Sequence, residues 1–269
     1  MGNMKMLWDH ISLCQQTYIG YLGNTWVNTE PYEMEDEVKK LMKTLKEMKV
    51  DKRANAYNGI LEENKKWLIF LPLIAELRSP SMRDRHWDAI RAKVKSNFQV
   101  DDKLTLNDVY KLNLQNYKED VEEITDQANQ EAKMEKNLAK LEENWKDIKF
   151  EFTQHKQSDV YTIKLSDENF DLLENDTNMA SSMQASRYIA TFEKEVEHWT
   201  RSLSQITEIL TVSSEVQRTW AYLENLFLHS DEVKKELPVQ AESFVKIDEE
   251  VKKILTDAYK KQYATVFCD

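Results

Sequence analysis

The chain has 269 residues, a formal net charge of −11 and only four glycines and four prolines. Average usage of about 7% glycine and 5% proline would give roughly 32 such residues in a chain of this length. No glycine follows Gly59, and the earlier ones have the wrong spacing, so the sequence excludes a Walker-type phosphate loop and a dinucleotide-binding turn. All-β and barrel folds are also excluded, because their tight turns need residues that tolerate positive φ.

The sequence also excludes several other classes of protein. The longest uncharged apolar run covers residues 67–75, whereas a membrane-spanning helix needs about 20 residues. The start of the chain lacks the apolar region of a secretory signal. Two cysteines near opposite ends, Cys14 and Cys268, and five scattered histidines predict a reduced, intracellular protein without a disulfide or a metal site. We expect no cofactor in this chain.

The charge is unevenly distributed. Residues 1–100 carry a net charge of +3, whereas residues 101–269 carry −14. This acidic majority argues against a nucleic-acid partner. The basic excess near residue 90 is compatible with a docking patch or with an ordinary solvated surface.

Helical periodicity dominates the first hundred residues. Pro72 lies inside one of these patterns and predicts a kink, because proline lacks the N–H that the helix needs. Ser79 and Pro80 predict the start of another helix, to about Lys95, with serine as the cap and proline in the first turn. The predicted helices before that pair span residues 4–22, 33–48 and 54–77.

The pattern switches to strict alternation on both sides of a polar link at residues 155–159. This predicts a β-hairpin near 149–165, which must pack on helices because two strands alone are marginal in water. Ser166 or Asp167 would then cap a short helix, followed by a polar stretch over 174–186. The other predicted helices span 105–112, 114–148, 181–210 with a continuation to 229, and a last one from Pro238.

These elements predict a mainly α fold, an elongated multi-helix bundle with one β-hairpin. We divide it into three subdomains of one continuous structure: residues 1–100, residues 101–175 with the hairpin, and residues 176–269 with the long helix. No residue pattern predicts catalysis. There is no Gly-x-Ser-x-Gly elbow, and paired carboxylates such as Glu122-Glu123 fall on polar helix faces.

Five blocks in a fixed order carry a family resemblance. The resemblance covers residues Met34 to Ile254. The first block is the segment 67–87, which ends in Arg83-Asp-Arg-His-Trp87, and the second is Phe150-x-Phe152. The remaining three are Ala185-Ser-Arg-Tyr188 with Phe192-Glu-x-Glu-Val196-x-x-Trp199, then Val216 to Phe227, and finally Leu237-Pro238 with Phe244-x-x-Ile-Asp248. In these blocks the chain resembles dynein heavy chains, and the segment 67–87 is more similar to axonemal than to cytoplasmic ones.

The resemblance implies that the chain is most of the linker of a dynein heavy chain. In that family the linker lies across a ring of AAA+ modules, bends when the first module binds ATP, and straightens as products leave. The implied partner is the ring of the same heavy chain, together with other tail or regulatory proteins, and no membrane or nucleic acid. ATP and magnesium would bind in the ring, which this sequence does not reach, so the chain itself would not be an enzyme. The implied location is cytoskeletal, in the axoneme of a cilium or flagellum.

The resemblance also marks two groups of residues. The first would contact the ring or neighbouring linker helices, the alternative being an internal salt-bridge network with Asp84 and Asp88. The second would form a hinge, which we place first at the junction 174–188, the alternative being a plain surface loop. The contact group is Arg83, Arg85, His86, Trp87 and Arg91. The hinge group is Pro72, Asp176, Ser186, Arg187 and Tyr188.

An alternative function belongs to another class. A static helical scaffold, such as a spectrin-like or tethering bundle that binds a protein partner, would show the same periodicity. It would keep one rigid shape and would not depend on a nucleotide-driven ring. The residues alone leave both functions open.

Overall fold

The computed structural model describes residues 2–268. Over these residues the chain forms eleven α-helices, two short 3₁₀ helices and one antiparallel two-stranded sheet, which confirms the predicted mainly α fold with a single hairpin. The chain divides into two compact units, Met1–Ala132 and Lys133–Asp269, and each has its own apolar core. The predicted division into three subdomains stays a prediction.

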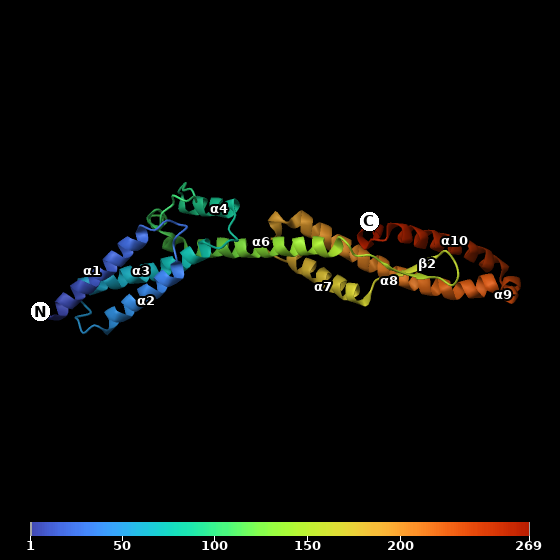
Figure 1. Ribbon diagram of the computed structural model, residues 1–269, viewed down its shortest axis with the longest axis horizontal. Coiled ribbons are helices and arrows are strands. Elements are labelled where there is room, and N and C mark those ends of the chain that lie inside the picture. The colour runs from blue at the N-terminus through green and yellow to red at the C-terminus, as the bar shows by residue number, and fades with distance from the viewer. Residues whose placement is uncertain (1, 269) are drawn as a thin grey trace. The chain divides into compact units, whose positions relative to one another are not determined.

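The first unit is built from antiparallel helices joined by short links. Helix α2 packs along α3, and α1 lies against both (Figure 1). The stripe Met34, Val38, Leu41 and Leu45 on α2 is buried, as expected for apolar residues three or four positions apart. Its elements are α1 (Gly2–Leu22), α2 (Pro31–Glu47), α3 (Asn55–Leu77), α4 (Asp84–Val94), α5 (Leu106–Tyr110), η1 (Leu114–Tyr117) and the first half of α6 (Lys118–Trp145).

An aromatic cluster forms the centre of this unit around Trp67. Its indole stacks on Tyr18, with ring centroids 4.9 Å apart, and on Tyr110 at 5.0 Å. Tyr21 and Phe70 meet the same indole edge-on. Offset and edge-to-face pairs of this kind add to the free energy gained by burying the rings, so Trp67 joins three segments of the chain in one contact.

Pro72 lies inside α3, which runs unbroken from Asn55 to Leu77. A proline in a helix interior costs about 3 kcal/mol. The neighbouring Leu71, Leu73 and Ile74 are all buried, and their packing offsets that cost. The predicted kink at Pro72 stays a prediction.

The predicted helix start at Ser79-Pro80 is wrong, since α4 begins at Asp84 with Arg83 in the N-cap position. Ser79 instead opens a turn: its carbonyl accepts from the Met82 N–H at 3.1 Å, and its hydroxyl accepts from the Ser81 N–H at 3.3 Å. Serine and proline are as favourable in such a turn as at a helix start. The local signal was therefore correct for a backbone bend and wrong for the helix.

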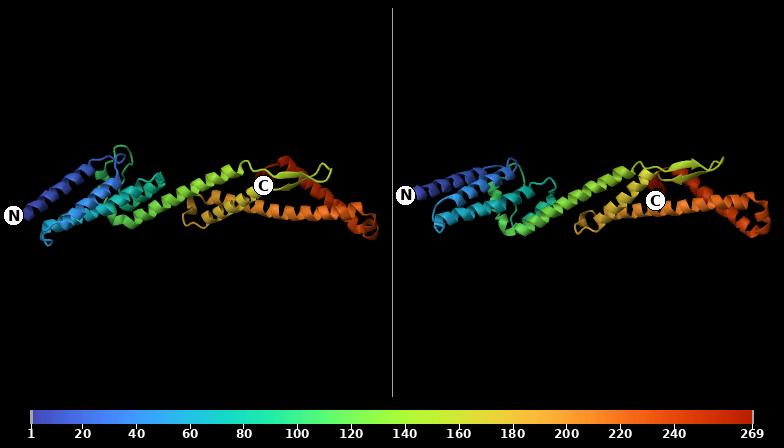
Figure 2. Two further views of the ribbon diagram at one scale, coloured as in Figure 1. Left: turned by 60° about the horizontal axis from the view of Figure 1, so that its bottom comes forward. Right: turned by 90° about the horizontal axis from the view of Figure 1, so that it is seen from below.

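The second unit surrounds one long helix, α8. Helix α7, the hairpin, α10 and α11 all pack on α8, and the hairpin lies along α8 and α10 (Figure 2). In the hairpin, Phe152 pairs with Ile163 and Glu151 with Lys164. Its elements are the second half of α6, β1 (Glu151–Gln154), β2 (Tyr161–Lys164), α7 (Asp167–Gln184), η2 (Ile189–Thr191), α8 (Glu193–His229), α9 (Asp231–Glu236), α10 (Pro238–Lys261) and α11 (Ala264–Cys268).

The polar stretch 174–186 is mostly helix, which corrects our expectation. Ser166 caps α7 by accepting from the Asn169 N–H at 3.2 Å, and the helix continues to Gln184. Its buried positions, Leu173, Asp176, Ala180 and Met183, lie three or four residues apart, so they form one face. This buried face does not look apolar in the sequence, because it contains a carboxylate and an alanine. The long helix accordingly begins at Glu193 and not near 181.

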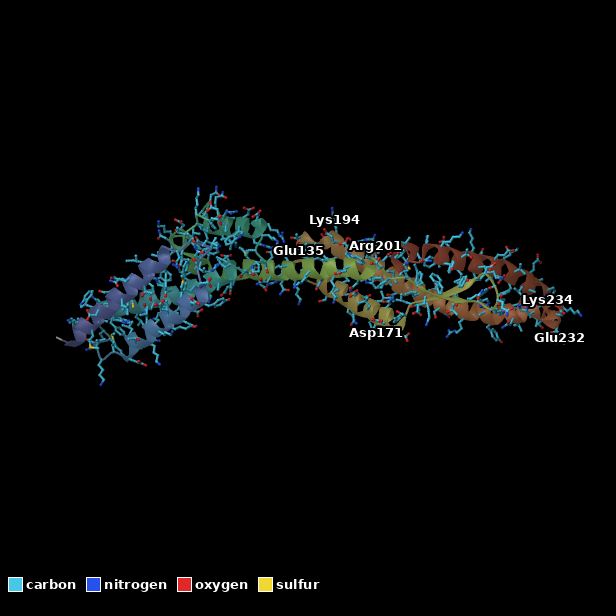
Figure 3. The ribbon with its side chains drawn as sticks, viewed as in Figure 1. Glu135, Asp171, Lys194, Arg201, Glu232 and Lys234 are labelled. Atoms are coloured by element: carbon cyan, nitrogen blue, oxygen red, sulfur yellow. The ribbon has the colours of Figure 1, made fainter. Side chains whose placement is uncertain are left out.

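Charged side chains cover the outside of the second unit. Asp171, Lys194 and Arg201 project from α7 and α8 into solvent (Figure 3). Among residues 2–268, no helix combines the length and the apolar character that crossing a bilayer requires. The same residues contain no cluster of three histidine, cysteine or acidic side chains placed to hold a metal ion.

Candidate functional site

The start of α4 arranges the predicted contact residues. The Arg83 backbone N–H donates to His86 Nδ1 at 3.0 Å, which satisfies one of the free N–H groups at the helix N-terminus. Because Nδ1 accepts this bond, the neutral imidazole carries its proton on Nε2. The Arg83 side chain turns back and donates from Nη1 to the Pro80 carbonyl at 2.8 Å.

Glu131 on α6 is the acceptor around which this cluster is built. Its side chain is 1% exposed, and its Oε2 accepts from Arg85 Nε at 2.7 Å and from Arg85 Nη2. His86 Nε2 donates to the same oxygen at 3.1 Å, and Gln127 Nε2 donates to Oε1 at 2.7 Å. The carboxylate is therefore buried but fully paired, as a buried charge must be. It connects α4 to α6.

Two ionisations depend on this geometry. Burial lowers the pKa of His86, and the neighbouring Glu131 carboxylate only partly opposes it. Burial alone would raise the pKa of Glu131, but hydrogen bonds from Gln127 and Arg85 outweigh it and hold that pKa below its ordinary value. At neutral pH the pair is thus a neutral imidazole and a carboxylate.

This arrangement predicts a pH dependence of stability. The unfolded chain protonates His86 near its ordinary pKa of 6.5, whereas the folded chain does so only at lower pH. The neutral His86 therefore contributes its full stabilisation of the folded chain above pH 6.5, and this contribution is lost as the pH falls through the pKa of His86 in the folded chain. The free energy of unfolding, measured with urea, should fall between pH 7.5 and pH 5.5. We expect this fall to be smaller for His86→Gln than for the unchanged chain. Equal losses in both proteins would contradict this assignment. His10, whose pKa burial also lowers, accounts for part of the remaining loss.

Trp87 and Arg91 are also turned toward the protein. Trp87 is 9% exposed and packs edge-on against Trp26 and Phe98, with centroids 5.9 and 6.1 Å away. Arg91 donates from Nε to the Phe98 carbonyl at 2.8 Å and from Nη1 to Asp88 at 2.6 Å. Its guanidinium carbon lies 5.5 Å from the Phe98 ring centre. These two residues hold the segment after α4 in place.

A second polar cluster fastens the hairpin turn to α8. His155 Nε2 lies 2.8 Å from Glu224 Oε2, and Lys156 Nζ lies 2.5 Å from the same oxygen. The His155 ring also packs on Trp220 at 4.4 Å between centroids. Burial alone would raise the pKa of Glu224, but the Lys156 and His155 contacts outweigh it and lower that pKa. No local sequence pattern predicts this cluster, because its partners are 68 and 69 residues apart.

Gln217 on α8 completes the sheet from its outer side. Its amide accepts from the Ile163 N–H at 2.7 Å and donates to the Ile163 carbonyl at 3.0 Å. These are the backbone groups that an adjacent strand would otherwise satisfy. A glutamine in a helix thus substitutes for a third strand, and the short hairpin keeps its position on α8.

Apart from Pro72 in α3, the predicted hinge residues lie in two different settings. Asp176 is buried in the middle of α7 and accepts from Trp145 Nε1 at 2.9 Å and from Asn144 Nδ2 at 3.1 Å. Ser186, Arg187 and Tyr188 lie between α7 and α8, where the regular helix is interrupted. There the Ser186 carbonyl accepts from the Ile189 N–H at 3.3 Å, and the Arg187 guanidinium lies 4.5 Å from the Tyr188 ring centre.

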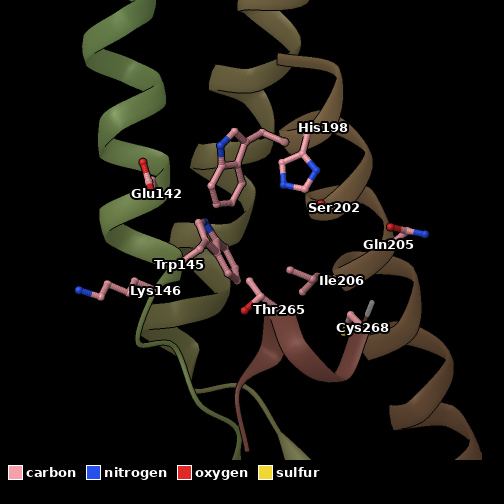
Figure 4. Close-up of a pocket in the computed structure, with 10 residues that line it drawn as sticks. Glu142, Trp145, Lys146, His198, Ser202, Gln205, Ile206, Thr265 and Cys268 are labelled. Carbon is pink, nitrogen blue, oxygen red and sulfur yellow. The ribbon is translucent and has the colours of Figure 1, made fainter. Parts of the chain in front are cut away.

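A cavity of about 320 Å³ opens between α6, α8 and α11 (Figure 4). Trp145, Ile206 and Cys268 form part of its wall, together with His198. The first three also belong to the buried core of the second unit. We therefore interpret the cavity as a gap in core packing and not as an active site.

Comparison with known proteins decides the family. A sequence profile described as "Dynein heavy chain, N-terminal region 2" matches residues 1–269. The chain belongs to the dynein heavy chain family. It is 38% identical to the Dynein alpha chain, flagellar outer arm, of Chlamydomonas reinhardtii over 99% of this chain, and 32% identical to the Dynein beta chain, ciliary, of Tripneustes gratilla over 96%. It is 30% identical to Dynein axonemal heavy chain 17 of Homo sapiens over 96%. The chain spans about 6% of the length of these dynein heavy chains.

The family resemblance stated from the sequence is thereby confirmed. In this dynein heavy chain region the residues Arg85 and His86 form a contact between α4 and α6, and their partner Glu131 has no signal in the sequence. Of the acidic partners expected, Asp88 is engaged, by Arg91. The contact of this group with a ring and the hinge at 174–188 stay predictions.

Proposed function

We propose that this chain acts as a mechanical linker of a dynein heavy chain, which couples ATP-driven rearrangement of an AAA+ ring to movement along microtubules. The observation that carries the proposal is the match of the dynein N-terminal region over residues 1–269. In this proposal the chain is a non-catalytic lever arm, and ATP and magnesium act in the ring of the parent protein. Its partner is that ring, with other tail or regulatory proteins as further partners.

The structure of the second unit supports a force-bearing role. Helix α8 is continuous over 37 residues, about 55 Å at 1.5 Å per residue. It is packed along its length by α7, by the hairpin, by α10 and by α11. A helix supported on several sides resists bending more than an isolated one, because bending would separate packed side chains. Such an element is suited to transmitting displacement.

The location follows from the relatives' names and is part of the proposal. The relatives are described as flagellar outer-arm and ciliary dynein chains. We place this chain in the axoneme of a cilium or flagellum on that basis. Its net charge of −11 is compatible with a cytoskeletal assembly.

A Gly-Gly insertion after Val196 tests the lever in a dynein heavy chain that carries this sequence. Val196 is buried near the start of α8, and two extra residues rotate the rest of the helix by about 200°. We expect microtubule gliding speed to fall more than ATPase rate, because force transmission is lost while the ring stays intact. Equal loss of both rates would favour ring contact over leverage.

The matched control is the same insertion after Lys52, which lies in the exposed link between α2 and α3. We expect this insertion to leave both rates nearly unchanged.

The purified 269-residue chain should show no ATP hydrolysis of its own. Turnover that follows the purified chain and disappears on mutating its side chains would overturn the non-catalytic assignment. Gliding that is unchanged by the Val196 insertion would favour a static scaffold.

A further inference from the structure

An apolar groove runs between α8 and α10 in the second unit. It has a volume of about 360 Å³ and a mainly aliphatic and aromatic lining. The α10 wall is formed by Phe244, Ile247 and Val251, spaced three and four residues apart. The α8 wall is formed by Val212, Glu215, Val216, Thr219, Trp220 and Leu223.

The outer edges of both walls are left open to solvent. Val212 is 52% exposed, Val216 is 42% exposed and Ile247 is 50% exposed, and Ile254 continues the α10 edge at 54%. Single exposed apolar residues are common on any protein. Here Val212, Val216 and Ile247 lie on facing walls of one groove, and apolar side chains gathered in this way are typical of an interaction site.

Three carboxylates lie on or next to the rim of this groove. Glu215 lines it, Glu208 lies one turn before Val212, and Glu250 lies between Ile247 and Ile254 at i+3 and i−4. Residues at these spacings share a helix face. All three carboxylates are exposed, and none forms an ion pair within the described residues. Residues 133–269 carry a net charge of −8, which adds to the negative potential at the groove.

We propose that this groove binds an amphipathic helix of another polypeptide, whose apolar stripe is flanked on both sides by lysine or arginine. Two antiparallel helices with an apolar seam between them offer the surface that a third helix fills. The three unpaired carboxylates select a basic partner over an acidic one by charge complementarity. The α8 wall from Val212 to Leu223 is about 16 Å long, which accommodates about three turns of the partner. The proposal does not depend on the lever function.

The test uses two labelled model peptides and the complete 269-residue chain. Each peptide has about 14 residues, enough for nearly four helical turns, with leucine at i, i+3, i+4 and i+7. One carries lysine at the flanking positions and the other carries glutamate. By fluorescence anisotropy we expect the lysine peptide to bind with a Kd below ~100 µM and at least ~10-fold more tightly than the glutamate peptide. No binding of the lysine peptide at millimolar protein would overturn the proposal.

Paired substitutions separate the groove from general charge attraction. Ile247→Glu should raise the Kd of the lysine peptide at least ~10-fold. Val245→Glu, at an exposed valine outside the groove lining, should change that Kd less than ~2-fold. The double change Glu215→Lys with Glu250→Lys should reverse the preference toward the glutamate peptide. The matched double change Glu232→Lys with Glu249→Lys should not reverse it. Equal effects within either pair would overturn the proposal, and circular dichroism of each variant establishes that it is folded.

Discussion

Replacing Trp67 with alanine is expected to lower the free energy of unfolding of the first unit by about 3–5 kcal/mol, the usual cost of removing a buried tryptophan. Trp67 is 1% exposed and contacts four other aromatic rings that come from α1, α3 and α5. Its indole N–H has no hydrogen-bond partner within the described residues. The expected loss is therefore one of packing, and a smaller side chain leaves a cavity that helices on several sides cannot close.

Trp8→Ala is the matched control for this prediction, since Trp8 on α1 is 55% exposed. It should cost less than about 1 kcal/mol. Urea unfolding monitored by circular dichroism gives both values. Because the chain has two units, the transition should be fitted to two steps, and the step assigned to the first unit should shift in Trp67→Ala. Equal shifts for the two variants would contradict a core role for Trp67.

Replacing Glu131 with leucine is expected to destabilise the contact between α4 and α6 by about 2–3 kcal/mol. The change leaves the His86 Nε2–H buried without an acceptor, and an unsatisfied buried donor costs about 1–3 kcal/mol. Arg85 also loses its carboxylate, but its side chain is 42% exposed, so water replaces part of that contact. Removing one member of a fully buried pair would cost more, about 3–5 kcal/mol.

Glu123→Leu is the control for Glu131→Leu, because it removes a carboxylate from the exposed face of the same helix. We expect its effect on urea unfolding to stay within about 0.5 kcal/mol. A further variant, Glu131→Gln, keeps the size and one acceptor oxygen, and should recover part of the loss. If Glu131→Leu were no more destabilising than Glu123→Leu, the buried pair would contribute nothing to the contact.

Local patterns were sufficient for most elements. Residues 149–154 and 160–165 alternate with period two, which predicts the hairpin, and the observed strands fall inside those limits. Helix α10 was found from Pro238 at its first position. In each of these segments the local preference and the tertiary packing agree, so short-range rules are sufficient.

Local patterns failed where two conformations satisfy the same residues. Ser79-Pro80 fits a turn as well as a helix start, and the turn formed. The face of α7 that carries Asp176 looks polar in sequence but is buried, because Trp145 and Asn144 donate to that carboxylate. A buried acid with partners on another helix has no local signature.

The scarcity of glycine is the feature that the sequence determined most clearly. It excluded nucleotide-binding loops, and it is consistent with α8, which runs 37 residues without interruption. The sharp turns are made at a cost by other residues, since Lys95, Asn113, Lys156 and Gln262 take positive φ within the described part of the chain. Helix periodicity and the family motifs depend only on residues close together in the chain. The sequence alone was therefore sufficient to predict the helices and the family.

Only the tertiary structure decided which polar residues meet. Glu131 accepts from Arg85 across 46 positions, Glu224 contacts His155 across 69, and Gln217 bonds Ile163 across 54. The apolar groove between α8 and α10 likewise combines residues from two helices. Such contacts depend on how the helices pack, and the free energy of burying a charge depends on the partner it finds there. No spacing along the chain encodes that partner, so the structure was needed to identify it.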